Sequence, residues 1–359
     1  MKRRELVLGV AGVMVSSVVA AAPVTTYNIA VLTDNSGPFA DLGKRLAART
    51  QVIQWWNENE GAKLGIKLDA KVYDTRYDPS VVASIWPGIV SGDKPILGLG
   101  LGGPDVSALQ ERLPGDKIPV LYATPGYGYS WTENSWIFNI RPSYVQEYIS
   151  GLNWFIDNNP TKRPVKVAFI STQASPAFVD MVKGITKYID EKLKPKGLAE
   201  VVATEWVQIQ PVDLGSQIQR IGGAKADIIF GLANTAMAGA VVRAQKLHGV
   251  SIPTMASPWH TIWPVAQAMK SYKPWEGNYT ITGIVSSTEK AGLAHDFYEK
   301  FAAKYDLGKE WDPLTLLGIS QGIAAVKAIE VTAKRVGSDK VTGSAIYETL
   351  TTHKFTENE

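Results

Sequence analysis

The strongest constraint on the fold of this chain is a repeated alternation of apolar segments, polar turns and amphipathic segments. In the first part of the chain, strand–helix units are expected to start at Tyr27, Gly65, Ile96 and Ile118. Strands that alternate with helices in this way pair in parallel, and helices cover both faces of the sheet. The sequence therefore predicts an α/β fold with a doubly wound parallel sheet.

A second series of the same kind follows a helix expected at residues 146–158. Strands predicted at 165–170, 198–206, 226–230 and 252–256 alternate with helices predicted at 178–193, 214–222 and 235–247. We therefore expect two doubly wound lobes in series. Open α/β sheets bind ligands at the carboxyl ends of their strands, so a ligand cleft is expected between the lobes.

A glycine-rich turn follows the strand within residues 94–109, where Gly98, Gly100 and Gly103 match the G-x-G-x-x-G pattern. A dinucleotide site would also need an acidic residue after the next strand to hold a ribose, but residues 123–126 contain none. No cofactor is therefore predicted. Two interpretations stay open: the glycines allow close packing of strand and helix, or they present backbone N–H groups to an anionic or polar ligand.

The N-terminus has the pattern of an export signal. Met1-Lys2-Arg3-Arg4 precedes an apolar run from Leu6 to Ala22 that is rich in small residues. We expect residues 1–21 to be a secretory signal peptide, cleaved near Ala21 or Ala22; Ala21 is favoured because a cut after Ala22 would leave Pro23 directly behind it. The 359 residues contain no cysteine, which excludes disulfides, thiolate metal sites and a lipid-acceptor cysteine. The mature protein is expected to be periplasmic, soluble and without a lipid anchor.

Charge and motifs exclude several classes of function. The net charge of +3 falls by 2, to +1, when Lys2, Arg3, Arg4 and Glu5 leave with the signal peptide, so no broad basic face for nucleic acid is expected. No pair of histidines has metal-ligand spacing, which predicts no metal. No nucleophile elbow, pair of catalytic carboxylates or phosphate loop is found, so an enzyme is not predicted.

Three motifs carry a resemblance to a known family. Residues 31–43 (VLTDNSGPFADLG), 73–79 (YDTRYDP) and 138–142 (FNIRP) resemble the opening helix motif, the Asp-Pro turn and the inter-lobe crossing of periplasmic solute-binding proteins of ABC importers, of the branched-chain amino acid (Leu/Ile/Val)-binding type. The resemblance covers nearly the whole mature chain. It implies a type I periplasmic-binding fold with two lobes joined by three crossings, closure on a small-molecule solute and delivery to an inner-membrane ABC permease.

The resemblance also implies how the chain is divided. Lobe 1 is expected to comprise residues 22–142 and 284–346, and lobe 2 residues 143–283 and 347–359. Since chains of this family continue with further strands of the second lobe, the end at Glu359 resembles a truncation. We expect a monomer.

The same resemblance, together with aromatic residues on the predicted cleft loops, gives the expected ligand-binding residues. They are Phe39, Tyr77, Gly102, Gly103, Thr124, Gly126, Tyr127, Ser175, Pro176, Asn234, Thr235, Trp259 and His260. Structural roles remain open for several of them: Thr124 as a turn residue, the aromatic side chains as core, and His260 as a surface residue.

The expected ligand class follows from one departure from the family. In amino-acid binders an acidic residue pairs with the ligand ammonium, but the matching residues 257–260 contain no acid. A buried unpaired ammonium costs several kcal/mol, about 3 or more. With the aromatic loops and with room left by Gly102 and Gly103, this favours an aromatic or other carboxylate. The alternatives are a branched-chain or other amino-acid or amide binder that uses a relocated acid such as Asp105, and a periplasmic ligand sensor.

Overall fold

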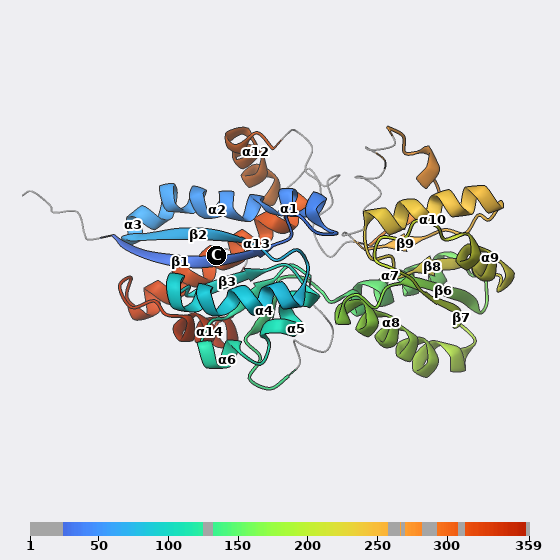
Figure 1. Ribbon diagram of the computed structural model, residues 1–359, viewed down its shortest axis with the longest axis horizontal. Helices are drawn as coiled ribbons and strands as arrows, with labels where there is room; N and C mark the ends of the chain where they lie inside the picture. The colour runs from blue at the N-terminus through green and yellow to red at the C-terminus, as the bar shows by residue number, and fades with distance from the viewer. Residues whose placement is uncertain are drawn as a thin grey trace, which may run out of the picture.

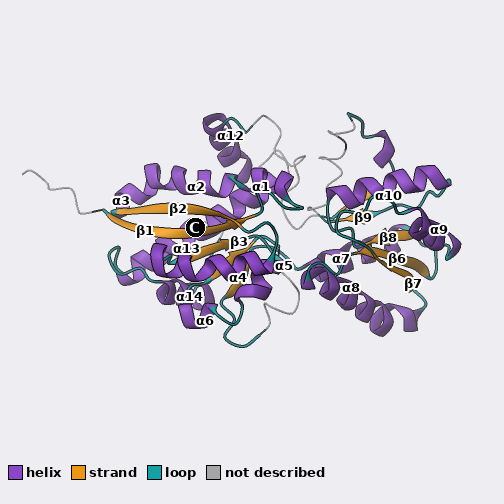
Figure 2. Ribbon diagram, in the orientation of Figure 1, coloured by secondary structure: helices purple, strands orange, loops and turns teal. Residues whose placement is uncertain are grey.

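The structure, a computed structural model, describes residues 24–124, 132–257, 266, 270–281, 293–307 and 313–356. Within these ranges the chain forms two α/β lobes that lie side by side along the long axis of the molecule (Figure 1). Strands fill the inside of each lobe and helices the outside (Figure 2). The predicted signal peptide and the predicted site residues Gly126, Tyr127, Trp259 and His260 lie outside the described residues.

Lobe 1 is built on a five-stranded parallel sheet with the order β2-β1-β3-β4-β5. The strands are β1 (Thr25–Thr33), β2 (Ile66–Asp74), β3 (Leu97–Gly100), β4 (Val120–Tyr122) and β5 (Ile137–Asn139). The first four are the predicted strands. The fifth comes from the segment that the sequence marked only as the crossing between the lobes.

Helices cover both faces of this sheet, as predicted. They are α1 (Ala40–Leu46), α2 (Ala48–Trp56), α3 (Ala62–Leu64), α4 (Pro79–Gly88), α5 (Gly103–Leu109), α6 (Leu113–Asp116), α12 (Leu293–Tyr305), α13 (Pro313–Val336) and α14 (Gly343–Thr352). Strand β1 serves both cores, because its side chains alternate: Ile29 and Val31 join the core under α2 and α13, whereas Leu32 joins the core under α4 and α5.

Helix α13 is long and apolar enough to cross a membrane by length and composition, but 67% of its most apolar window, within Leu314–Val336, is buried inside the protein. It packs closely on α2, since a Cβ on Gly322 would lie 2.7 Å from Cβ of Val52. Helix α13 is therefore a core helix of lobe 1, formed by a segment far along the chain from β1.

Helix α14 departs from the predicted lobe boundary. The expectation assigned residues 347–359 to lobe 2, but Tyr347 stacks on Trp136 of lobe 1 with ring centroids 4.2 Å apart. In addition, the hydroxyl of Thr332 on α13 donates to that of Thr349 over 2.8 Å. The α14 residues beyond Ile346 therefore lie on lobe 1 (Figure 1), because the apolar face of this helix continues past the point at which the family pattern would leave the lobe.

Lobe 2 has a three-stranded parallel sheet with the order β7-β6-β8. The strands are β6 (Val165–Ser171), β7 (Ala199–Trp206) and β8 (Ile228–Phe230), extended by a parallel pair formed by β9 (Met255–Ala256) and β10 (Tyr279–Thr280). The helices are α7 (Tyr144–Asn158), α8 (Pro176–Tyr188), which continues as a helical turn to Leu193, α9 (Gly215–Gly223) and α10 (Thr235–His248). All four helices and the first four strands were predicted, with ends that differ by a few residues.

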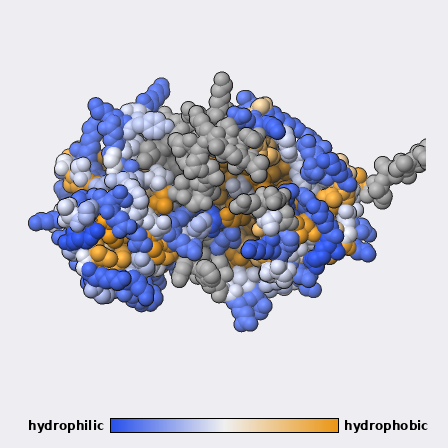
Figure 3. Space-filling model, turned by 180° about the vertical axis from the view of Figure 1, so that it is seen from behind, coloured by the Kyte–Doolittle hydropathy of each residue, from blue (hydrophilic) through white to orange (hydrophobic). Residues whose placement is uncertain are grey.

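One hydrophobic cluster extends from the core of lobe 2 into lobe 1. It joins Phe169 and Phe230 of the second sheet to Phe39, Leu101 and Ala123 at the ends of the first. Seen from behind, most of the coloured surface of both lobes is hydrophilic, with smaller hydrophobic areas (Figure 3). The shared cluster shows that the lobes contact each other through apolar residues at the ends of their strands.

Candidate ligand site between the lobes

The closest approach of the two lobes joins the start of α5 to the start of α8. A Cβ on Gly103 would lie 2.1 Å from Oγ of Ser175 and 3.1 Å from Cβ of Ala177. A side chain at this position would force the hydroxyl of Ser175 to rotate away or the two lobes to separate. Gly103 is thus required for the close contact, which agrees with the packing interpretation of the glycine turn.

Gly102 makes room for a second hydroxyl, on its own lobe. A Cβ on Gly102 would lie 2.1 Å from Oγ1 of Thr124, and this hydroxyl donates to the carbonyl of Leu101 over 2.6 Å. The expectation that the missing side chains of Gly102 and Gly103 leave room for a larger solute is therefore wrong for this arrangement. The hydroxyls of Thr124 and Ser175 fill that space.

The carboxylate of Asp105 is engaged by its own turn. Its Oδ2 accepts the N–H groups of Leu101 over 2.8 Å and Gly102 over 3.3 Å, and the residue is 1% exposed. Burial raises the pKa of Asp105 to about 6, although these N–H groups and Arg49 oppose the shift. Two of the turn's N–H groups are thus used internally by Oδ2 of Asp105, while its Oδ1 is buried without a hydrogen-bond partner.

Phe39 and Tyr77 form one aromatic wall of the contact. The carboxylate of Asp34 accepts the N–H of Phe39 over 2.8 Å and so fixes the start of α1. The two rings lie 4.4 Å apart between centroids. Burial raises the pKa of Tyr77 well above its ordinary value, while interaction with the nearby hydroxyl of Ser175 in lobe 2 lowers it. Tyr77 therefore links the two lobes.

Tyr144 and Phe178 of lobe 2 form the facing wall, with ring centroids 6.0 Å apart in a stacked arrangement. Burial raises the pKa of Tyr144, and interactions with Arg141 and with the hydroxyl of Thr124 of lobe 1 partly oppose the shift. Sequence reasoning missed Tyr144. The available signal was its place in the first turn of α7, directly after the N-cap Ser143 and the crossing motif.

A buried ion pair lies where the chain first crosses between the lobes. Arg141 donates from Nη1 to Oε1 of Glu147 and from Nε to the carbonyl of Ala123 over 2.9 Å, and its guanidinium lies 5.0 Å from the ring centroid of Tyr144. The side chains of the pair are 0% and 2% exposed. Oε2 of Glu147 has no hydrogen-bond partner. From the sequence, Arg141 was identified only as part of a crossing motif, and Glu147 was not identified.

The remaining predicted residues of lobe 2 begin helices. Ser175 is the N-cap of α8, accepting the N–H of Ala177 over 3.3 Å, and Pro176 is the first residue of that helix. Asn234 is the N-cap of α10, accepting the N–H of Met237 over 2.9 Å and donating to Ile209. The hydroxyl of Thr235 is buried without a hydrogen-bond partner. Asn234 and Thr235 thus lie at the end of β8 and are not joined to the contact by any of these interactions.

We use the term inter-lobe contact for the residues that the structure brings together from both lobes. They are Phe39, Tyr77, Gly102, Gly103 and Thr124 of lobe 1, and Tyr144, Ser175, Ala177 and Phe178 of lobe 2. Within the described part of the chain, no group of three or more acidic or histidine side chains could hold a metal ion.

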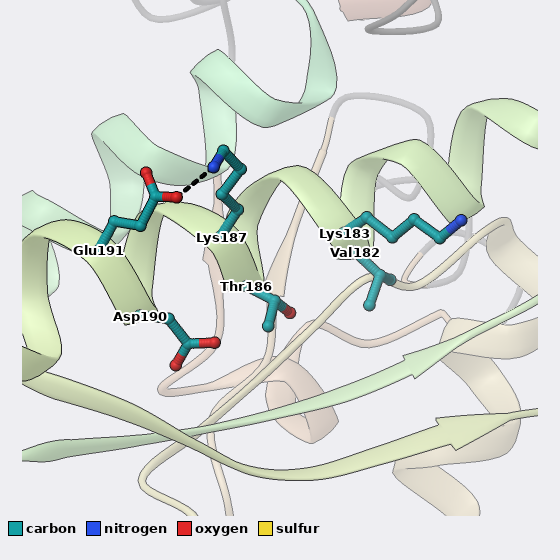
Figure 4. Close-up of a pocket in the computed structure, with 6 residues that line it drawn as sticks. All are labelled: Val182, Lys183, Thr186, Lys187, Asp190 and Glu191. Carbon is teal, nitrogen blue, oxygen red and sulfur yellow. Dashed lines mark hydrogen bonds and ion pairs between the residues drawn. The ribbon is translucent and has the colours of Figure 1, made fainter.

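Two hollows lie outside this contact. One, of about 410 Å³, is lined entirely by consecutive turns of α8 and its extension, where Lys187 pairs with Glu191 (Figure 4). The other, of about 670 Å³, lies beside the ends of β6 and β7 and is lined by Gln173, Trp206 and Pro211 among others. The hollow on α8 uses one face of one helix, so it lacks the converging elements of a ligand site.

Comparison with known proteins places this geometry in a family. The sequence profile of the periplasmic binding protein family matches residues 26–358. No curated protein sequence matches the chain.

Solved structures with this fold include three ABC transporter proteins. A branched chain amino acid ABC transporter protein from Thermus thermophilus with bound valine is 16% identical, covering 93% of this chain and 85% of its own, with a TM-score of 0.80. A fatty acid ABC transporter substrate-binding protein from Thermomonospora curvata is 19% identical (92% and 82% covered, TM-score 0.77). A solute binding protein from R. palustris in complex with benzoate is 17% identical (92% and 87% covered, TM-score 0.73).

These matches confirm the predicted type I periplasmic-binding fold. The family and the matched structures are substrate-binding proteins of transport rather than enzymes, as the sequence also indicated. The chain belongs to the periplasmic binding protein family.

Proposed function

We propose that this protein captures a small carboxylate, aromatic or otherwise, between its two lobes and delivers it to an inner-membrane ABC permease. The observation that carries the proposal is the composition of the inter-lobe contact. Four aromatic rings and the hydroxyls of Tyr77, Thr124, Tyr144 and Ser175 converge there. Aromatic rings supply apolar walls for a planar body, and hydroxyls can donate to a carboxylate.

The charges around the contact support a ligand without an amine. Asp34 and Asp105 already accept backbone N–H groups, and Glu147 pairs with Arg141. Because their pKa values are raised, Tyr77 and Tyr144 keep their protons at neutral pH and remain available as donors. The contact thus offers hydroxyl donors to an anion, and each of these three acids already has at least one partner within the protein.

The likeness to solved structures agrees with a carboxylate but does not select one. The matched proteins hold valine and benzoate, and one is named for fatty acids. All three are carboxylates. The aromatic walls of this chain favour the benzoate-like class.

In the proposed cycle the lobes rotate about the crossing at residues 140–143. The open form admits the solute, and the contacts between Tyr77 and Ser175 and between Thr124 and Tyr144 re-form around it. Export to the periplasm after removal of residues 1–21, a monomeric state, and lobe boundaries near residues 142 and 284 are parts of this proposal. The permease would bind the closed form of the protein.

An amino-acid ligand is the second candidate, and one observation favours it. The buried Oε2 of Glu147 has no hydrogen-bond partner, so it offers an acceptor for an ammonium group close to Arg141 and Tyr144. This acid differs from Asp105, the one that the sequence suggested. The double variant Arg141→Met with Glu147→Leu separates the two candidates: it removes the acceptor without leaving a buried charge, so it should weaken binding of leucine but not of benzoate.

A thermal-shift screen of the mature protein tests the proposal. The probes are benzoate, octanoate, leucine and benzamide, each at rising concentration. A ligand at 100 times its Kd stabilises a protein by about 2.7 kcal/mol. We expect benzoate to give the largest rise in Tm and benzamide none. If leucine raises Tm and neither benzoate nor octanoate does, the proposal of a ligand without an amine is wrong and the amino-acid candidate takes its place.

A further inference from the structure

Beneath the inter-lobe contact, two buried polar side chains tie together the ends of three strands. Arg49 of α2 donates from Nη2 to the carbonyl of Leu32 and from Nη1 to Oε1 of Gln321, each over 2.9 Å. Gln321 of α13 donates from Nε2 to the carbonyls of Gly100 over 2.9 Å and Leu121 over 2.7 Å. Arg49 is 1% exposed and Gln321 0%. The ends of β1, β3 and β4 are thereby held by one pair of side chains.

Close packing of α13 on the first helices brings this pair together. A Cβ on Gly318 would lie 3.0 Å from the carbonyl oxygen of Leu46, and one on Gly322 would lie 2.9 Å from that of Arg49. Small residues four positions apart let the two helix backbones approach closely. Gln321 lies between these glycines in the sequence. Its side-chain amide therefore contacts both Arg49 and the strand ends.

The three strands lead directly to the lobe 1 side of the contact. Phe39 follows β1, Gly102 and Gly103 follow β3, and Thr124 follows β4. The carbonyl of Gly100, held by Gln321, also accepts the N–H of Ala123 over 3.2 Å. The carbonyl of Ala123 in turn accepts Nε of Arg141 at the crossing. A continuous chain of hydrogen bonds therefore runs from α13 through the strand ends to the hinge.

Arg49 places a charged guanidinium in the core of lobe 1, where apolar side chains are usual. Burial lowers the pKa of Arg49 to about 10, partly offset by Asp105, so the guanidinium stays protonated at neutral pH. A buried cation and its partner are often replaced by apolar residues without loss of stability. What apolar residues could not do is hold three backbone carbonyls in fixed positions through directed hydrogen bonds.

We propose that Arg49 and Gln321 are positioning residues, which hold the ends of β1, β3 and β4 so that Phe39, Gly103 and Thr124 face the ligand. This inference rests on the proposed function at the same cleft. Gln321→Leu removes both carbonyl contacts while keeping the size of the side chain. The matched control is Thr332→Val, on the same helix and equally buried, whose hydroxyl bonds Ala328 and Thr349 away from the strand ends.

The first readout needs no ligand: hydrogen exchange of the backbone amides of Ala123 and Thr124 in the free protein. We expect exchange at least about fivefold faster in Gln321→Leu than in Thr332→Val, since each buried hydrogen bond lost is worth about 1 kcal/mol, a factor of about five. Equal exchange in the two variants would overturn the positioning role. Should Gln321→Leu fail to fold, the double variant Arg49→Met with Gln321→Leu removes the buried charge as well and gives the same comparison.

The second readout is binding of benzoate by calorimetry. We expect affinity to fall about tenfold in Gln321→Leu and to stay unchanged in Thr332→Val. Faster exchange with unchanged affinity would overturn the role in ligand capture. If the wild-type protein binds no benzoate, octanoate or leucine, the proposed function fails, and the exchange comparison by itself decides whether the pair positions the strand ends.

Discussion

The hydroxyl of Ser175 occupies the place where a side chain on Gly103 would begin, with only 2.1 Å between Oγ and an added Cβ. The two residues come from different lobes and start the helices α5 and α8. Their spacing makes the approach of the lobes depend on the absence of a single methyl group. It also links the glycine turn, the most conspicuous motif of the sequence, to the contact between the lobes.

Gly103→Ala is therefore expected to hold the lobes apart while each lobe stays folded. The clash costs about 1–3 kcal/mol in the closed form and nothing in the open one. Small-angle scattering should show a larger radius of gyration than for the wild type, and affinity for the ligand should fall. Gly115→Ala is the control, because a Cβ there meets no atom within 4 Å. A compact Gly103→Ala protein with full affinity would contradict the account.

Tyr77→Phe removes the hydroxyl that lies near that of Ser175 and could donate to a carboxylate, but keeps the ring against Phe39. One net hydrogen bond is worth about 1 kcal/mol, so the affinity for the carboxylate is expected to fall about fivefold. Calorimetric titration measures this. Tyr347→Phe, on the α14 side of lobe 1, should leave affinity unchanged, and equal losses in the two variants would show that the effect is not local.

Asp105 gives a prediction for the dependence of stability on pH. Burial raises its pKa from 3.8 to about 6, so between these values the folded state binds more protons than the unfolded state. Its contribution to stability is therefore greatest below about pH 4 and is lost as the pH rises through about 6. The size is about 3 kcal/mol, from a shift of about two pKa units.

Urea unfolding of the wild type and of Asp105→Asn at pH 4 and pH 7 isolates the contribution of Asp105 to the free energy of unfolding. The asparagine keeps an acceptor for the N–H of Leu101 and does not titrate. We expect the wild type to gain stability relative to the variant on going from pH 7 to pH 4. A difference between the two proteins that does not change with pH would argue against a buried, proton-binding carboxylate.

The Arg141–Glu147 pair predicts strong coupling in a double-mutant cycle. Removing either partner leaves a buried charge, which costs about 3–5 kcal/mol. Arg141→Met and Glu147→Leu should each destabilise the protein strongly, whereas the double variant should recover much of the loss. Denaturant unfolding measures all three. Simple additivity of the two single losses would mean that the side chains do not form a pair in solution.

Much of the fold could be predicted from the sequence because it depends on local periodicity. The alternation of strands and helices gave all the lobe 2 helices and four strands of lobe 1. The missed strand β5 has only three residues and lies in a segment with turn signals on both sides. The misplaced boundary at Ile346 came from the family pattern, since nothing in the sequence of α14 shows which lobe its apolar face meets.

The site was less predictable, because it depends on contacts between distant residues. The positions of Phe39, Tyr77, Thr124 and Ser175 follow from strand ends, which sequence reasoning located well. The partners that fill the space beside Gly102 and Gly103 come from other strands and from the other lobe, so the sequence suggested empty room where hydroxyls lie. Glu147 and Gln321 lie inside helices, where nothing in the sequence separates a buried polar residue from an exposed one.

The most direct test of the central claim is a crystal structure of the mature protein with its best carboxylate probe from the screen. The account predicts the ligand between the lobes, its carboxylate within hydrogen-bond distance of at least two of the hydroxyls of Tyr77, Thr124, Tyr144 and Ser175. A ligand held elsewhere, such as in the hollow beside Trp206, or one whose carboxylate meets none of these hydroxyls, would contradict it.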